Sequence, residues 1–169
     1  MTLQSTIQFS MAAAIVGTPA VGASQAALNL PLGWNLVNGT GAGQADTAWW
    51  VQSTLAASTS ETWDFAGTLR DLLNNLITLA RIKALVVTAA AGNTNNVVIG
   101  GGATTLATLF GATTHTTPVR PGGTVAWFVG ANDAVGYTVT SGTGDLLQVG
   151  NSGAGSSVTY TIAVIGASA

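Results

Sequence analysis

The chain has very few charged side chains. Only four Lys or Arg and six Asp or Glu occur among its 169 residues, which is 6% of the sequence. A soluble domain ordinarily carries about 25% charged residues, which keep its surface hydrated and separate from its neighbours. We therefore expect much of this surface to be covered by other protein, as in a subunit of an assembly.

Basic residues are scarcest, and cysteine is absent. The four basic residues are scattered and none precedes position 70, whereas nucleic-acid binding needs Lys and Arg gathered against phosphates. No nucleic-acid partner is expected. Without cysteine there is neither a disulfide framework nor a thiolate metal site, which fits folding in a reducing cytoplasm.

Long hydrophobic runs are also lacking, although Ala and Val are frequent. No stretch reaches the 18 or more apolar residues of a membrane span, so no membrane partner is expected. Residues 1–10 contain no Lys or Arg, unlike the start of a secretory signal, and we expect them to belong to the mature protein.

The residues that enzymes use are few and lack their usual motifs. His115 is the one imidazole, and the chain has neither a Gly-x-Ser-x-Gly elbow nor a His-Glu-x-x-His pair. Asp71, Asp133 and Asp145 fit turns and caps. Two of the acids brought together in space would still permit glycoside hydrolysis. Our prediction is a non-enzymatic protein with no catalytic residue, no cofactor and no metal.

The first 37 residues are predicted to form an N-terminal strand or arm that is able to pair with another subunit. Residues 2–9 alternate apolar and polar side chains with the period of a half-buried strand, and residues 12–16 can continue it. Pro19, Gly22, Pro31 and Gly33 then predict turns and loops, with a short strand at 34–37.

Residues 38–169 are predicted to form one β-sandwich domain. Short apolar or alternating segments recur between Gly-, Asn- and Pro-rich turns, as in an antiparallel sandwich or jelly roll, so the fold class is all-β. The expected strands are 47–55, 62–65, 82–88, 96–99, 117–119, 124–129, 136–140, 146–149 and 157–165. A Thr-rich loop at 103–117 contains three bulky apolar residues and is expected to be ordered.

One segment has a helical pattern. Leucines and other apolar residues at 69–80 follow helical spacing, and Thr68 with Asp71 resembles a capping pair. Asn74 and Asn75 tolerate a left-handed turn that would end the helix, with a strand from near Ile77. We favour this second interpretation, with one short helix near 68–75, and leave open a single helix to residue 80.

The five Trp residues are the remaining conspicuous feature. Alternation places Trp49 and Trp50 on opposite faces of a strand, so at least one of them leaves the core. Residues 124–129 are apolar on both faces, and one face is expected against a neighbouring subunit. Exposed Trp occurs at subunit interfaces and also stacks on glycans. The candidate interface residues are Leu3, Ile7, Phe9, Trp34, Trp50 and Phe128.

Several segments between 38 and 169 carry a family resemblance. They are NGTGAGQAD at 38–46, ETWDFAGTLRD at 61–71, RIKAL at 81–85, RPGG at 120–123, GYTVTSGTGDLL at 136–147 and VTYTIAVIG at 158–166. In these segments the chain resembles small structural proteins of tailed bacteriophages.

The resemblance implies a β-sandwich subunit of the virion, assembled in the host cytoplasm. It further implies a head decoration or cement protein that forms a homotrimer and binds the major capsid protein. The alternative is a tail-fibre or spike module that holds a host glycan through Trp50 or Trp34.

Overall fold

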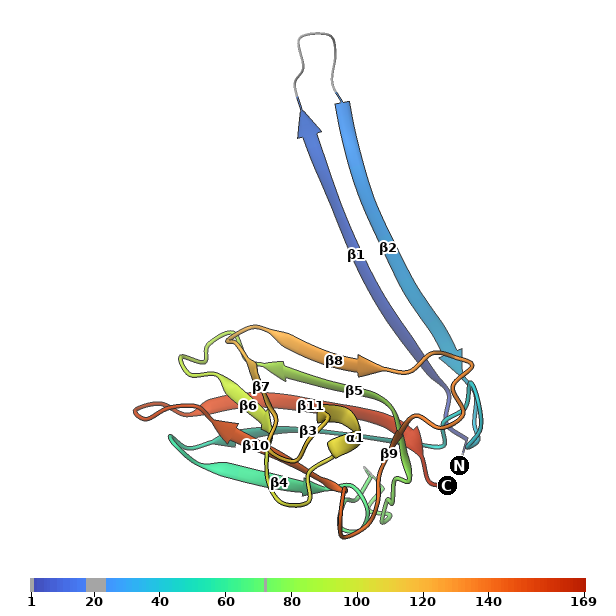
Figure 1. The fold of residues 1–169 in the computed structure, drawn as a ribbon, viewed down its shortest axis with the longest axis vertical. Coiled ribbons are helices and arrows are strands. Elements are labelled where there is room, and N and C mark those ends of the chain that lie inside the picture. The colour runs from blue at the N-terminus through green and yellow to red at the C-terminus, as the bar shows by residue number, and fades with distance from the viewer. Residues whose placement is uncertain (1, 18–23, 72) are drawn as a thin grey trace.

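The structure, a computed structural model, describes residues 2–17, 24–71 and 73–169. Two antiparallel sheets stack into a sandwich, and a two-stranded arm leaves one end of it (Figure 1). The predicted all-β sandwich is therefore confirmed. Within the described ranges no helix is long and apolar enough to cross a membrane.

The smaller sheet has four strands in the order β4-β10-β6-β7. The bounds of these strands are Ser60–Asp64 for β4, Val97–Gly100 for β6, Thr116–Val119 for β7 and Leu146–Asn151 for β10. Leu147 and Val149 of β10 are fully buried, whereas Gln148 between them is not. The two-residue alternation of the sequence thus sets which face of this sheet enters the core.

The larger sheet has five strands. Its order is β3-β11-β5-β8, and β9 also pairs with β5. The bounds are Thr47–Leu55 for β3, Arg81–Ala89 for β5, Thr124–Phe128 for β8, Tyr137–Thr138 for β9 and Val158–Ala167 for β11. The inward side chains of β11, among them Tyr160, Ile162 and Val164, are almost completely buried. They form the centre of the core.

Aromatic side chains close one end of the core. Trp49 packs against Trp63 and Phe65, with ring centroids 5.1 and 6.1 Å away. The Trp63 indole donates a hydrogen bond of 2.8 Å to the Tyr160 hydroxyl, which in turn donates to Glu61. Burial and the Glu61 hydrogen bond raise the pKa of Tyr160 well above its usual range, so this hydroxyl keeps its proton as a donor.

The arm consists of β1 (Ser5–Gly17) and β2 (Ser24–Leu36), which pair antiparallel from Ser5 opposite Leu36 to Gly17 opposite Ser24. The expected loop across Pro31 and Gly33 is wrong, because β2 runs through both residues. In a two-stranded ribbon each strand is an edge, and an edge tolerates a proline whose nitrogen faces outward. Pro19 and Gly22 lie outside the described residues.

The expected helix near 68–75 is also wrong, as no described residue there is helical. Asp71 Oδ1 instead accepts hydrogen bonds of 2.8 Å from the backbone amides of Leu73 and Asn75, and Asn74 adopts a φ of 65°. Such side-chain bonds to the backbone compete with helix formation. The strand expected from near Ile77 begins only at Arg81.

A short helix does occur, within the Thr-rich loop expected to be ordered. It is α1 (Ala107–Phe110), which ends at Gly111 in the left-handed conformation. Leu106 and Leu109 are buried, so they anchor this loop to the core.

The division of the larger sheet into an inner and an outer face can be tested on neighbouring residues of β11. Ile162 is 0% exposed, whereas Thr161 points to the outer face. Ile162→Ala should lower the free energy of unfolding by about 2–5 kcal/mol, because it leaves a cavity in the core. Thr161→Ala should cost less than about 1 kcal/mol. Urea unfolding measures both, and equal losses would contradict the assigned faces.

Candidate assembly interface

The arm has one apolar and one mostly polar face. Residues directly opposite one another in an antiparallel pair point to the same side, and successive residues alternate between sides. Over residues 7–15 of β1 and 26–34 of β2, one face therefore carries only apolar side chains. The members of this apolar arm face are Ile7, Phe9, Met11, Ala13 and Ile15 of β1 and Ala26, Leu28, Leu30, Leu32 and Trp34 of β2. The opposite face carries Thr6, Gln8, Ser10, Gln25, Asn29 and Asn35, together with Val16, Pro31 and several Ala and Gly residues.

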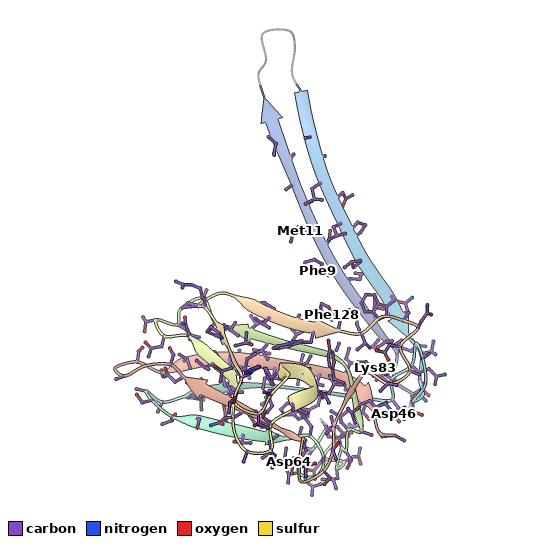
Figure 2. All side chains as sticks on the ribbon, in the orientation of Figure 1. Phe9, Met11, Asp46, Asp64, Lys83 and Phe128 are labelled. Atoms are coloured by element: carbon purple, nitrogen blue, oxygen red, sulfur yellow. The ribbon has the colours of Figure 1, made fainter. Side chains whose placement is uncertain are left out.

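Exposure of the apolar arm face rises from its base to its tip. Ile7 at the base is 6% exposed, Phe9 40% and Ile15 78%. Figure 2 shows Phe9 and Met11 along the arm, beyond the body of the sandwich. A monomeric protein rarely exposes so continuous an apolar strip, and a two-stranded hairpin alone is only marginally stable in water. The exposed part of this face is therefore the leading candidate for a contact surface.

A small hydrophobic cluster joins the base of the arm to the body. Its buried members are Ile7, Leu36, Ala45 and Ala84, with Leu3, Trp34, Phe128 and Ile165 packed around them. Within this arm joint the rings of Trp34 and Phe128 meet edge to face, with centroids 6.3 Å apart. Such a pair contributes about 0.5–1.5 kcal/mol beyond the area that it buries.

Backbone hydrogen bonds set the direction in which the arm leaves the body. Val37 donates to the Gly43 carbonyl at 3.0 Å, and Ala45 donates to the Val37 carbonyl at 2.9 Å. The Arg81 guanidinium donates to the Thr40 carbonyl at 2.8 Å, which ties this loop to β5. The chain therefore turns from the arm into the sandwich through a fixed loop.

The outer face of the larger sheet carries no charge in its cross-strand rows. The registers align Ala48, Ile165, Ala84 and Phe128 in one row and Trp50, Ala163, Val86 and Ala126 in the next. A third row holds Gln52, Thr161, Thr88 and Thr124. We call the first two rows the apolar sheet rows. An outward sheet face ordinarily carries polar or charged residues, so these rows are a second candidate contact surface.

A groove of about 650 Å³ separates the arm from the apolar sheet rows. Phe9 and Leu32 line it on the arm side, and Val86 and Ala126 line it on the sheet side. The apolar arm face and the apolar sheet rows thus face each other across the groove, and beyond the joint nothing in the described residues fills it. The two candidate surfaces are continuous with each other through the joint.

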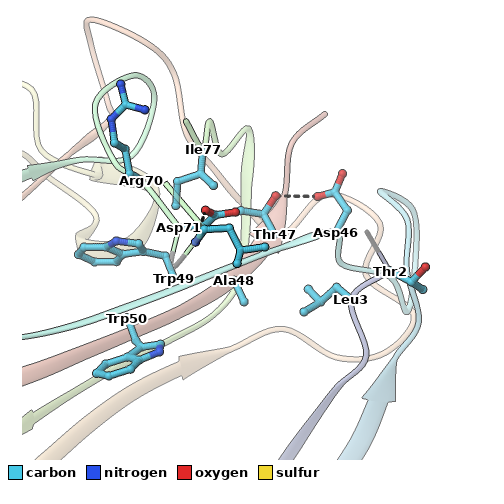
Figure 3. Close-up of a pocket in the computed structure, with 11 residues that line it drawn as sticks. Thr2, Leu3, Asp46, Thr47, Ala48, Trp49, Trp50, Arg70, Asp71 and Ile77 are labelled. Carbon is cyan, nitrogen blue, oxygen red and sulfur yellow. Dashed lines mark hydrogen bonds between the residues drawn. The ribbon is translucent and has the colours of Figure 1, made fainter. Parts of the chain in front are cut away.

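A second hollow of about 440 Å³ lies beside β3, and Figure 3 shows its lining. Trp50 stands at its edge and is 55% exposed. Asp46, Arg70 and Asp71 supply polar groups to the same lining. The Trp50 indole lies on the opposite side of β3 from Arg70 and Asp71 (Figure 3), and its exposed ring keeps Trp50 in consideration as a contact for a sugar.

The structure divides the predicted interface residues into two groups. Leu3, Ile7, Trp34 and Phe128 lie together in the arm joint, within one chain. Phe9 and Trp50 remain exposed, on the arm and on the sheet rows. The expectation that Trp49 or Trp50 leaves the core is confirmed, because Trp49 is buried and Trp50 is not.

Sequence reasoning missed the β2 half of the apolar arm face. Leu28, Leu30, Leu32 and Trp34 recur at every second position, which is the signature of a strand with one apolar face. Pro31 and Gly33 occupy the alternate positions and hid this period by indicating a turn. The signal was therefore present in the spacing of the leucines.

The acidic residues serve local structure. Asp133 accepts hydrogen bonds from the amides of Val135 and Gly136, which lower its pKa, and Asp145 accepts one from Gly142. Burial raises the pKa of Asp46, but hydrogen bonds from Ser168 and Thr47 outweigh burial and leave that pKa below its ordinary value. The turn roles predicted for Asp71, Asp133 and Asp145 are confirmed.

His115 and Lys83, two further ionisable residues, each form a hydrogen bond with a backbone carbonyl. His115 is exposed and bonds through Nδ1 to the Phe110 carbonyl at 2.9 Å. The buried Lys83 donates to the Asp133 carbonyl at 2.7 Å, and burial lowers its pKa. Among the described residues no three side chains of His, Asp or Glu gather closely enough to hold a metal ion.

Comparison of the chain with protein-family models, curated proteins and solved structures found no match. The apolar arm face and the apolar sheet rows are therefore the features that indicate a function.

The arm joint can be tested by Phe128→Ala. Losing the ring that packs against Trp34 should lower the free energy of opening the joint by about 1–2 kcal/mol, so joint amides exchange about 5–30 times faster. Hydrogen–deuterium exchange at Leu3 and Val37, whose amides are bonded at the base, measures this. Phe9→Ala, outside the joint, is the control. Unchanged exchange in Phe128→Ala would contradict the joint.

Proposed function

We propose that this chain is a non-enzymatic structural subunit of a bacteriophage virion, most specifically a head decoration or cement protein that binds and stabilises the shell. The observation that carries the structural role is the exposed apolar face of the arm. The resemblance of residues 38–169 to structural proteins of tailed phages supports the virion as its location. The apolar sheet rows supply a second contact surface on the same side of the molecule.

The size of the apolar arm face indicates what kind of contact it makes. Six large side chains on it are 40–78% exposed: Phe9, Met11, Ile15, Leu28, Leu30 and Leu32. Full burial of one such side chain contributes about 1.5–3 kcal/mol, and the exposed parts of the six amount to about three whole side chains, so completing their burial contributes roughly 5–9 kcal/mol. Association costs about 4–15 kcal/mol, so one arm alone binds weakly. Stable attachment then requires several arms acting together or a contact of the body as well.

The chemistry of these surfaces favours a contact that is insensitive to salt. The arm contains no ionisable side chain, since the first Asp in the chain is Asp46 and the first basic residue is Arg70. Salt screens charge interactions and leaves apolar contacts largely intact. Binding to the shell should therefore change little between about 0.05 and about 0.5 M salt.

A variant pair tests the arm as the attachment element. Met11→Asp places a charge on the apolar arm face, whereas Ser10→Asp places it on the opposite face of the same strand. Both positions are exposed, so both variants should fold. Purified protein is added to phage heads produced without this chain, and the bound protein is measured after sedimentation.

Wild-type protein and Ser10→Asp should bind these heads, and Met11→Asp should lose most of the binding. A wild-type chain that does not bind heads would contradict the decoration role. Equal binding by the two variants would show that the arm does not mediate attachment.

The exposed Trp50 favours a second candidate function, a tail-fibre or spike module that binds a host glycan. Trp34 does not suit this role, because its ring is half-buried against Phe128 in the joint. If Trp50 stacks on a sugar, wild-type protein adheres to host cells and Trp50→Ala does not. Flow cytometry with labelled protein measures adhesion, with Phe9→Ala as a control that removes an exposed aromatic elsewhere. The decoration role predicts no adhesion by any of the three proteins.

A further inference from the structure

We infer that the exposed part of the apolar arm face seats on the apolar sheet rows of a second copy of this chain, so that neighbouring subunits exchange arms. This inference rests on the proposed function and specifies the partner of the arm. It commits the arm to a copy of the chain. The oligomer that the arms hold together then binds the shell, so Met11→Asp weakens head binding by weakening arm exchange.

The molecule itself shows that the two surfaces fit. At the joint, Ile7 and Trp34 of the apolar arm face already pack against Phe128, Ala84 and Ile165 of the first sheet row. The remainder of the arm face has the same chemistry, and the second sheet row continues the first. The contact between copies would therefore extend an interface that exists within each chain.

The distal part of the arm, beyond residue 9, does not pack on the sheet rows of its own chain. The arm diverges from the body after the joint (Figure 1). Phe9 on the arm and Ala126 on the sheet line the groove. Residues 9–17 span about 30 Å at about 3.3 Å per residue, and the ten residues of β11 span about 33 Å. The distal arm thus has the length to lie along a neighbour's sheet.

Charge and stoichiometry both favour a copy over an unrelated protein. Neither the arm nor the apolar sheet rows carries an ionisable side chain, so their contact buries no charge. Each copy has a net charge of −2, but the residues that carry this charge lie outside the contact. Each chain offers one exposed arm face and one set of exposed sheet rows. In a head-to-tail ring, the arm face and the sheet rows of every copy are covered by its two neighbours. Such a ring closes when the rotation that relates neighbouring copies divides a full turn evenly.

Single cysteines test this contact directly, because the natural chain has none. Met11→Cys places a thiol on the apolar arm face, and Ala163→Cys places one on the second sheet row. The two purified variants are mixed, oxidised under mild conditions and separated by non-reducing electrophoresis. Because each chain carries one thiol, every disulfide joins two chains and none can form within a chain.

The expected product is the mixed Met11→Cys with Ala163→Cys dimer, in clear excess over either symmetric dimer. Ser10→Cys mixed with Ala163→Cys is the matched control and should give little product, since Ser10 lies on the polar face of the arm. A dominant Met11→Cys symmetric dimer would overturn the inference by showing that arms pack on one another. Absence of any disulfide above the Ser10→Cys control would overturn it as well.

The head-binding assay separates this inference from the proposed function. Protein that fails to form the mixed disulfide but binds heads through an arm sensitive to Met11→Asp would overturn arm exchange alone. The arm would then contact the shell, and the decoration role would stand.

Discussion

The structure depends on one constraint: beyond its base, the apolar face of a two-stranded ribbon is covered by no other layer among the described residues. A sheet in a sandwich buries its apolar side against a second sheet, as Ile162 does here. The arm has no such layer beyond its joint with the body. The proposed contact with another molecule would bury the remaining apolar face, which a monomer rarely leaves exposed.

This constraint also explains the scarcity of charge in the sequence. Charged residues on the arm or on the sheet rows would lose hydration wherever those surfaces are covered. Asp71, Asp133 and Asp145 instead lie in turns, where their carboxylates accept hydrogen bonds from nearby backbone amides. The neutral surface is thus concentrated on the arm and on one face of one sheet, where contact between proteins needs it.

Much of the sandwich could be predicted from the sequence, because its strands carry a clear two-residue period. The alternation in β3 placed Trp49 and Trp50 on opposite faces, and the structure buries Trp49 and exposes Trp50. Prediction failed where two local rules competed. At 68–75 helical spacing of leucines competed with an Asp71 side chain that bonds to the backbone, and the side chain prevailed.

The interface was the hardest part to predict, since it depends on pairing between strands. Phe9 and Trp34 were recognised as candidates, but their different surroundings follow from the register that places Trp34 opposite Ile7 and Phe9 opposite Leu32. No pattern within β1 alone distinguishes a residue of the joint from one two positions further along the arm. Pro31 and Gly33, which usually break strands, concealed the partner strand and with it the second half of the apolar face.

The most direct measurement of the central claim, that assembly of copies buries the apolar arm face, is the rate at which hydrogen peroxide oxidises Met11. Oxidation of a methionine follows its exposure to solvent, and Met11 is 48% exposed in the single chain. Peptide mass spectrometry would give this rate over a dilution series, with a free peptide spanning Met11 as reference. We predict that oxidation slows several-fold as protein concentration rises and copies associate. A rate equal to that of the free peptide at every concentration would contradict the account.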